Sequence, residues 1–158
     1  MRYVRSPRMI LAVLCASTWL AVAQTAEKSA ASMADAATKF LAALTPEQRQ
    51  KAAFAFESEE RLKWHFIPTE MFPRNGLILG EMNEAQRKAA HGLLRSGLSQ
   101  SGYMTATAIM DLETVLNAIE SAARQAAPGG RSVENMRRDP VRYFFSVFGT
   151  PSARGAWG

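Results

Sequence analysis

The sequence ends in a dense run of large apolar residues. Six of the eight residues from 141 to 148 are bulky and apolar, and residues 143–148 read Tyr-Phe-Phe-Ser-Val-Phe. Because they occupy both faces of a period-two pattern, a strand here requires cover above and below and pairing along its sides. Residues 149–158 then end in Gly-Ala-Trp-Gly, which only begins another element. We therefore expect a strand whose sheet partners are missing or supplied from elsewhere.

The start of this run fits two conformations. Asp139 and Pro140 form a good cap and first-turn proline, and the apolar residues up to Phe148 also fit helical spacing. The aromatic and β-branched content, closed by Gly149, favours a strand. We predict one helical turn at 139–142 that leads into a strand over 143–148.

The first 23 residues have the pattern of a signal peptide. Arg2, Arg5 and Arg8 precede an apolar run over 9–23, which is too short to cross a bilayer and ends in Ala-Val-Ala. We predict cleavage before Gln24 and an exported, periplasmic or extracellular protein; a retained membrane anchor is the alternative. Residues 24–32 are expected to be a disordered tether, followed by a single domain over 33–158.

The net charge depends largely on this leader. It carries three of the 19 basic residues and none of the 14 acidic ones, so its removal lowers the formal charge from +5 to +2. The remaining basic residues are scattered, which gives no support to nucleic-acid binding. The single cysteine, Cys15, also lies in the leader. The mature chain is therefore expected to have no disulfide and no thiolate nucleophile.

Helical signals dominate the middle of the chain. Residues 33–44 carry apolar side chains at helical spacing, and Thr45, Pro46 and Gln48 form a capping signal for a second helix. Asn83 and Gln86 repeat this signal for a helix to about residue 99. A further helix is predicted over 103–125, packed antiparallel to its predecessor. Its inward stripe is expected to be Met104, Ala108, Ile109, Leu112, Val115, Leu116 and Ile119.

Between these helices the chain is predicted to be extended or looped. Residues 64–68 read Trp-His-Phe-Ile-Pro, and proline disfavours helix at the residue before it. Residues 69–80 form a loop with a short strand near 77–79. The expected fold class is α+β: a mainly helical fragment with an antiparallel helical pair and a C-terminal strand from an incomplete sheet.

The sequence contains none of the established catalytic motifs considered below. The sequence has no phosphate-binding glycine loop, no His-Glu-x-x-His and no paired-cysteine metal site. Ser99 resembles a nucleophile elbow, but Gly102 comes one residue late and a helix precedes it where a strand is needed. We interpret Ser99 as a helix end or cap.

The candidate catalytic residues are His65, Arg87, His91 and Glu113. His91 lies one helical turn after Arg87, so their side chains are neighbours. A half-buried structural hydrogen bond is the simpler interpretation of His91. Two histidines with scattered carboxylates supply few ligands for a metal ion. The identity of any metal stays unknown.

The candidate binding residues are Arg61, Trp64 and Trp157. Arg61 follows three glutamates in a segment typical of a solvated face, with Asp111 and Glu113 as alternative inward partners. Tryptophan is more often a core residue than a ligand platform, although the glycines beside Trp157 leave it free to line a pocket.

With these residues identified, the chain resembles the bacterial domain-of-unknown-function family 3500. The matching segments follow one another over most of the mature chain, and an insertion at 69–73 departs from the family pattern. They are Leu-Thr-Pro-Glu-Gln-Arg at 44–49, Arg61 with 64–68, Gln86-Arg87 with His91, 93–94, 97–99, 102–103, 109–110, 112–113, 139–140, 148–152 and 155–158.

The resemblance implies no activity, because the family has none assigned. It also implies that members continue beyond this point into a strand with an adjacent histidine pair. On that basis the chain is expected to be the N-terminal part of a larger family domain, truncated before the pair. A divalent metal in the full-length member is one implied cofactor.

Two functional hypotheses follow. The first is an exported metal-dependent or acid–base enzyme of hydrolase type, with a site incomplete in this chain. It requires His65, Arg87, His91 and Glu113 to converge around a cleft. The second is a non-catalytic envelope binding or interaction module, in which Trp64 and Trp157 form an apolar groove. A missing C-terminal segment or an oligomer partner would then complete the sheet.

Overall fold

The computed structural model describes residues 26–67, 69–126 and 138–158. The signal peptide and cleavage position predicted at 1–23 lie outside these residues. Residues 26–43 form an N-terminal helix, of which 26–32 were expected to be a disordered tether. This helix buries Ala37 and Phe40 completely. Burial of that face explains why the Ala-rich segment is helical, since propensity alone rarely holds a short helix.

The two predicted capping boxes are both present. Thr45 caps α2 (Pro46–Ala52), and Gln48 at the third helical position completes the capping box. Asn83 caps α3 (Glu84–Gly97), where Gln86 does the same. In each case the short N-cap side chain accepts a hydrogen bond from a backbone N–H in the first turn, and the glutamine side chain accepts one from the N-cap N–H.

Helix α2 ends at Ala52, and the chain continues as strand β1 (Ala53–Phe54). A short 3-10 helix, η1 (Glu59–Leu62), and a loop follow. Strand β2 (Leu77–Ile78), at the position predicted, leads into a second 3-10 turn, η2 (Leu79–Glu81).

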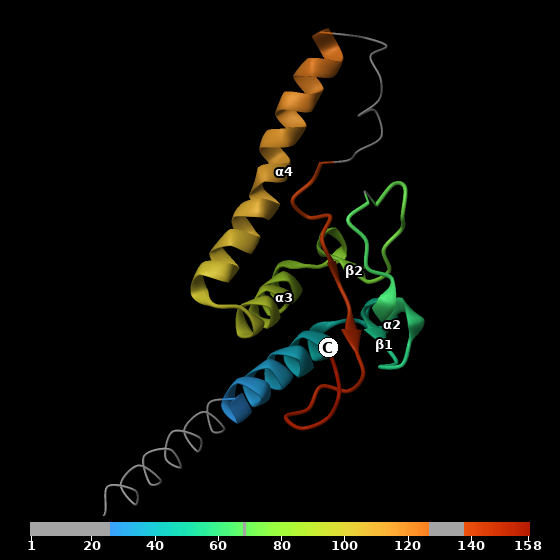
Figure 1. The fold of residues 1–158 in the computed structure, drawn as a ribbon, viewed down its shortest axis with the longest axis vertical. Helices are drawn as coiled ribbons and strands as arrows, with labels where there is room; N and C mark the ends of the chain where they lie inside the picture. Colours follow the sequence, from blue (N-terminus) through green and yellow to red (C-terminus); the bar gives the residue numbers. More distant parts are fainter. Residues whose placement is uncertain (1–25, 68, 127–137) are drawn as a thin grey trace, which may run out of the picture.

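The C-terminal segment crosses the molecule as two short strands. Strand β3 (Phe144–Phe145) pairs antiparallel with β2, and β4 (Val147–Phe148) pairs parallel with β1. Before them, the Arg142 N–H donates to the Asp139 carbonyl at 3.0 Å, which closes the single turn predicted there. Figure 1 shows this red segment running beside β2 and then down to β1.

The prediction that residues 143–148 lack partners within this chain is therefore wrong. Both strands find partners far away in sequence, in two two-stranded sheets. The last residues also return, because Phe148 and Gly158 exchange backbone hydrogen bonds of 2.6 and 2.9 Å. Gly76 permits the pairing: a Cβ there would lie 2.5 Å from Ser146 Oγ and 3.1 Å from the Phe145 carbonyl oxygen.

The core lies where these strands meet the helices. Phe40, Leu77 and Val147 are the largest fully buried side chains, and the rings of Phe40 and Phe145 lie 5.7 Å apart. The fold is thus α+β and mainly helical, as predicted, with long-range strand pairs that join the C-terminal segment to β1 and β2.

Helix α4 (Gln100–Ala126) departs most from expectation. It meets α3 near their connection, where Tyr103 contacts His91 and Arg95. Figure 1 shows the rest of α4 extending to an end far from the remaining described chain. The apolar stripe predicted to face inward is exposed: Met104, Ile109, Leu112, Val115, Leu116 and Ile119 all lie at the surface. The inward-facing side instead carries Tyr103, Met110 and Glu113.

Candidate functional site

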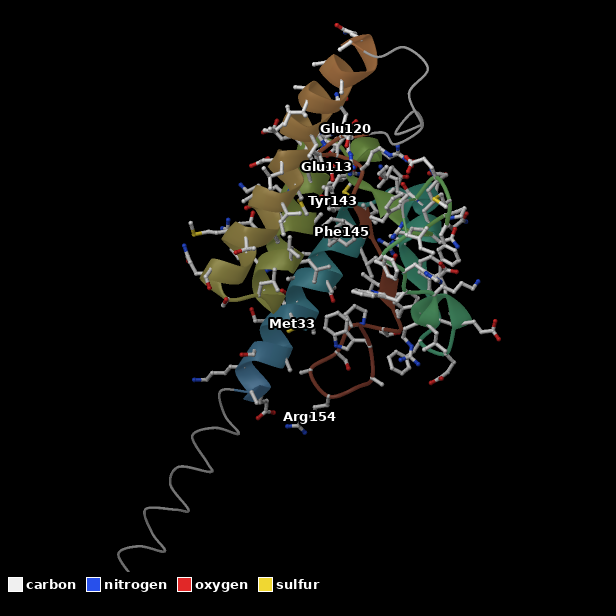
Figure 2. The ribbon with its side chains drawn as sticks, turned by 45° about the horizontal axis from the view of Figure 1, so that its top comes forward. Met33, Glu113, Glu120, Tyr143, Phe145 and Arg154 are labelled. Atoms are coloured by element: carbon white, nitrogen blue, oxygen red, sulfur yellow. The ribbon has the colours of Figure 1, made fainter. Side chains whose placement is uncertain are left out.

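The C-terminal segment borders the cavities that have functional interest. One cavity is apolar and lies between this segment and the helices. A second is charged and lies where the segment passes α4 and the loop over 66–74. A third lies beside η1. Figure 2 shows the seam between α4 and the segment, with Glu120, Glu113, Tyr143 and Phe145 in succession along it and Met33 on the N-terminal helix.

The apolar groove has a volume of about 560 Å³. The helices contribute its walls, and the consecutive residues 143–147 contribute its other side together with the C-terminal pair. Its apolar lining includes Met33, Leu93, Leu94, Met110, Phe145 and Trp157. A volume of this size with mainly apolar walls is typical of small-molecule sites.

Trp157 is fixed in this groove by the turn that precedes it. Its indole Nε1 donates to the Ser152 carbonyl at 2.8 Å, and the Gly155 N–H donates to Ser152 Oγ at 2.6 Å. The ring packs against the core. Trp157 therefore lines the apolar groove, whereas Trp64, which was expected to form a groove with it, lines another cavity.

The charged cavity, of about 460 Å³, is organised by Arg138. The Arg138 guanidinium donates to Glu120 at 3.0 and 3.1 Å and lies 3.7 Å from a Glu113 oxygen. The bond to Glu120 raises the pKa of Arg138 above its usual value, and the Glu120 and Glu113 charges add to this effect. Arg142 is paired with Glu70 at 2.9 Å in the same cavity.

Tyr143 connects this charged cavity to the groove, because it lines both. Its hydroxyl donates to Glu113 at 3.5 Å. Burial raises the pKa of Tyr143, and the Glu113 charge raises it further. The Tyr143 phenol is therefore neutral at neutral pH, where it acts as a hydrogen-bond donor to Glu113 and is a poor base.

Glu113 is the one predicted catalytic residue that lies in the charged cavity. Its carboxylate contacts Arg138 and Tyr143. These contacts connect α4 to the C-terminal segment.

His65 and two of the binding candidates line the third cavity, of about 410 Å³. The His65 ring lies 4.0 Å from that of Phe72, and Trp64 is 91 % exposed. Arg61 Nε donates to the Phe56 carbonyl at 2.9 Å, with its guanidinium over the Phe56 ring. Trp64 is therefore not a core residue, and Arg61 bonds neither of the carboxylates on α4 considered for it.

Arg87 and His91 lie on α3 with separate partners. Arg87 Nε donates to the Leu79 carbonyl at 3.0 Å, and His91 Nδ1 lies 3.2 Å from the Tyr103 hydroxyl. The bond to Tyr103 is the half-buried hydrogen bond considered for His91. None of the three cavities is lined by more than one of the four catalytic candidates.

Two features are absent from the residues that the structure describes. In that part of the chain, no three or more His, Cys, Asp or Glu side chains are grouped to hold a metal ion. Nor does any helix there have the length and hydropathy needed to cross a membrane.

Sequence reasoning missed Arg138, Glu120 and the groove residues Met33 and Leu94. The pair Arg137-Arg138 was the one local signal, since residues 24–158 contain only one other adjacent basic pair, Arg87-Lys88. The groove residues carried no such signal, because each looks like an ordinary core residue of its own helix.

Comparison with known proteins gives a family and no function. Residues 26–158 match the family model described as "Protein of unknown function (DUF3500)". Neither a curated protein nor a solved structure matches the chain significantly.

Proposed function

The chain belongs to the DUF3500 family of unknown function, and from that premise we propose that it is a non-catalytic interaction module that binds an extended apolar polypeptide segment. The observation that carries the proposal is the groove lined by residues 143–147. These consecutive residues include strand β3 and the first residue of β4, so an extended stretch of backbone borders the groove.

An extended polypeptide fits this geometry better than a compact ligand does. Strand β3 pairs with β2 along one edge and has no second strand partner among the described residues, and it lies within the segment 143–147 that borders the groove. A peptide that adds a strand gains main-chain hydrogen bonds from the edge, and its alternate side chains enter apolar pockets. Leu94, Met110 and Trp157 supply such apolar walls.

The enzymatic alternative has weaker support. Its four candidates have local hydrogen-bond or ring partners and line no common cavity. A general acid–base site needs such groups within reach of one substrate atom. The catalytic roles of His65, Arg87, His91 and Glu113 stay predictions.

Export is part of the same proposal. The basic and apolar leader at 1–23 supports a protein that works outside the cytoplasm, in the periplasm or beyond the cell. N-terminal sequencing of the protein recovered from the periplasm tests this directly. We expect the chain to begin at Gln24.

Calorimetric titration with a synthetic peptide tests the binding. We would use Lys-Val-Thr-Val-Thr-Val-Lys and a form of it N-methylated at alternate residues along one edge. The unmodified peptide is expected to bind with micromolar affinity, and Leu94→Glu to abolish binding by charging the groove wall. The matched control is Leu62→Glu, which changes an exposed leucine on η1.

The N-methylated peptide separates strand addition from apolar contact alone. It keeps every side chain but loses the edge donors, so a strand-adding site should reject it. Equal binding of the two peptides, or binding that survives Leu94→Glu, would contradict the proposed mode.

A further inference from the structure

Helix α4 is oriented with its more polar side toward the molecule. Its partly buried side carries Thr107, Glu113 and Glu120 beside Tyr103 and Met110. Its large aliphatic residues lie on the opposite side of the helix and are between 37 % and 61 % exposed. We call this surface the α4 face: Met104, Ile109, Leu112, Val115, Leu116 and Ile119.

Contacts to the rest of the protein hold this orientation. Tyr103 bonds His91 and lies under Arg95, and Glu113 and Glu120 bind Arg138. Tyr103, Glu113 and Glu120 all lie on the inward side of α4. The α4 face is therefore turned outward by specific polar contacts. A continuous exposed apolar stripe of this kind marks an interaction surface.

The spacing of the α4 face fits a helical partner. Ile109, Leu112, Leu116 and Ile119 are separated by three, four and three residues. This is the alternation that places apolar side chains along one seam between two packed helices. The partner is thus expected to be an amphipathic helix with the same spacing.

The same four residues are also symmetric about position 114. In an antiparallel pair centred there, Ile109 lies opposite Ile119 and Leu112 lies opposite Leu116 of the other copy. A two-fold dimer needs such a self-complementary surface, because each copy presents the same patch to the other. From this symmetry we propose that the α4 face binds the α4 face of a second copy of this chain, with the two helices antiparallel.

The charges on α4 argue against a lipid surface as the occupant. The helix carries Asp111, Glu113 and Glu120 against one arginine, Arg124. Helices that lie on membranes are rich in lysine and arginine on their polar side. Glu113 and Glu120 are bound by Arg138 on the inward side, so they leave the α4 face free of like-charge repulsion in the dimer.

The area that the α4 face can bury indicates how tightly the two copies bind. A helix of 27 residues is about 40 Å long, and a seam about 10 Å wide buries roughly 400 Å² per copy. The total of about 800 Å² lies below the range of stable complexes and is typical of transient ones. We therefore expect a reversible dimer with a micromolar dissociation constant.

Sedimentation equilibrium of the full chain across the micromolar range tests the dimer. We expect Leu112→Gln/Leu116→Gln to weaken self-association by about tenfold or more. The matched control is Leu62→Gln/Met71→Gln, which changes two leucine-sized exposed residues away from α4 and should leave the dissociation constant unchanged. Equal helical content by circular dichroism shows that the variants are folded. A chain that stays monomeric, or a dimer that survives the α4 double change, would overturn the proposal.

Disulfide trapping tests the antiparallel arrangement independently. In a Cys15→Ser background, Ile109→Cys and Ile119→Cys proteins are mixed and oxidised. The antiparallel dimer predicts mixed disulfides between the two proteins and few within either one alone. Disulfides formed mainly between identical chains would refute the arrangement. A monomer that binds phosphatidylcholine vesicles through Leu112 and Leu116 would also refute the proposal, because it would make lipid the occupant.

Discussion

Replacing Gln86 by alanine should destabilise the fold more than any comparable change to an exposed glutamine. Gln86 is 4 % exposed, and its side chain joins the starts of α2 and α3. Its Nε2 donates to the Ala43 carbonyl at 3.0 Å and to Gln48 Oε1 at 2.7 Å. Its Oε1 accepts from the Asn83 N–H at 2.9 Å and from Gln48 Nε2 at 3.1 Å.

The expected loss is about 3 kcal/mol of unfolding free energy. Truncation removes the four hydrogen bonds that the buried Gln86 amide makes, each worth roughly 0.5–1.5 kcal/mol net. Water that enters the vacated space recovers part of this cost. Urea denaturation monitored by circular dichroism measures the change, and the melting temperature should fall by about 10 °C.

Two further variants make this test specific. Gln50→Ala, an exposed position on α2, should change stability by no more than about 0.5 kcal/mol. The pair Gln48→Ala and Gln86→Ala should show a coupling of about 1 kcal/mol, because each amide bonds the other. A Gln86→Ala loss below about 0.5 kcal/mol would refute the argument that this amide pair joins the two helices.

Two other predictions concern backbone geometry and pH. Gly149→Ala should cost about 2 kcal/mol of unfolding free energy, because φ is +80° and the new Cβ would lie 3.0 Å from the Ala156 carbonyl oxygen. Gly92→Ala should instead stabilise the protein by about 0.5–1 kcal/mol, because Gly92 lies inside α3 and the new Cβ would have no atom within 4 Å. Thermal melts of the two variants measure both changes. Because burial raises the pKa of Tyr143, its contribution to stability should be fully present below the ordinary tyrosine value of 10.0 and be lost as pH rises through the higher folded value. Urea melts from pH 8 to 12 should therefore show a steeper decline for the parent chain than for Tyr143→Phe, and identical declines would contradict this assignment.

Local signals in the sequence determined the helix starts and the short strand at β2. Thr45 with Gln48 and Asn83 with Gln86 each act within one turn of helix, so the residues themselves predict the outcome. The turn at Asp139 and the extended conformation that follows it could also be predicted from the sequence, since proline restricts the local backbone and aromatic residues favour strands. The family resemblance was also carried by sequence alone, and the family model over residues 26–158 confirms it.

Tertiary structure decided what these elements contact. The partners of Phe144–Phe145 and Val147–Phe148 lie far back in the chain, at β2 and β1, and strand edges carry no sequence mark of their partner. The orientation of α4 was settled in the same way, by Tyr103 and by the pairing of Glu113 and Glu120 with Arg138. Periodicity identifies an apolar stripe on a helix, but contacts between distant residues decide whether that stripe faces the core or the solvent, and here they turned it outward.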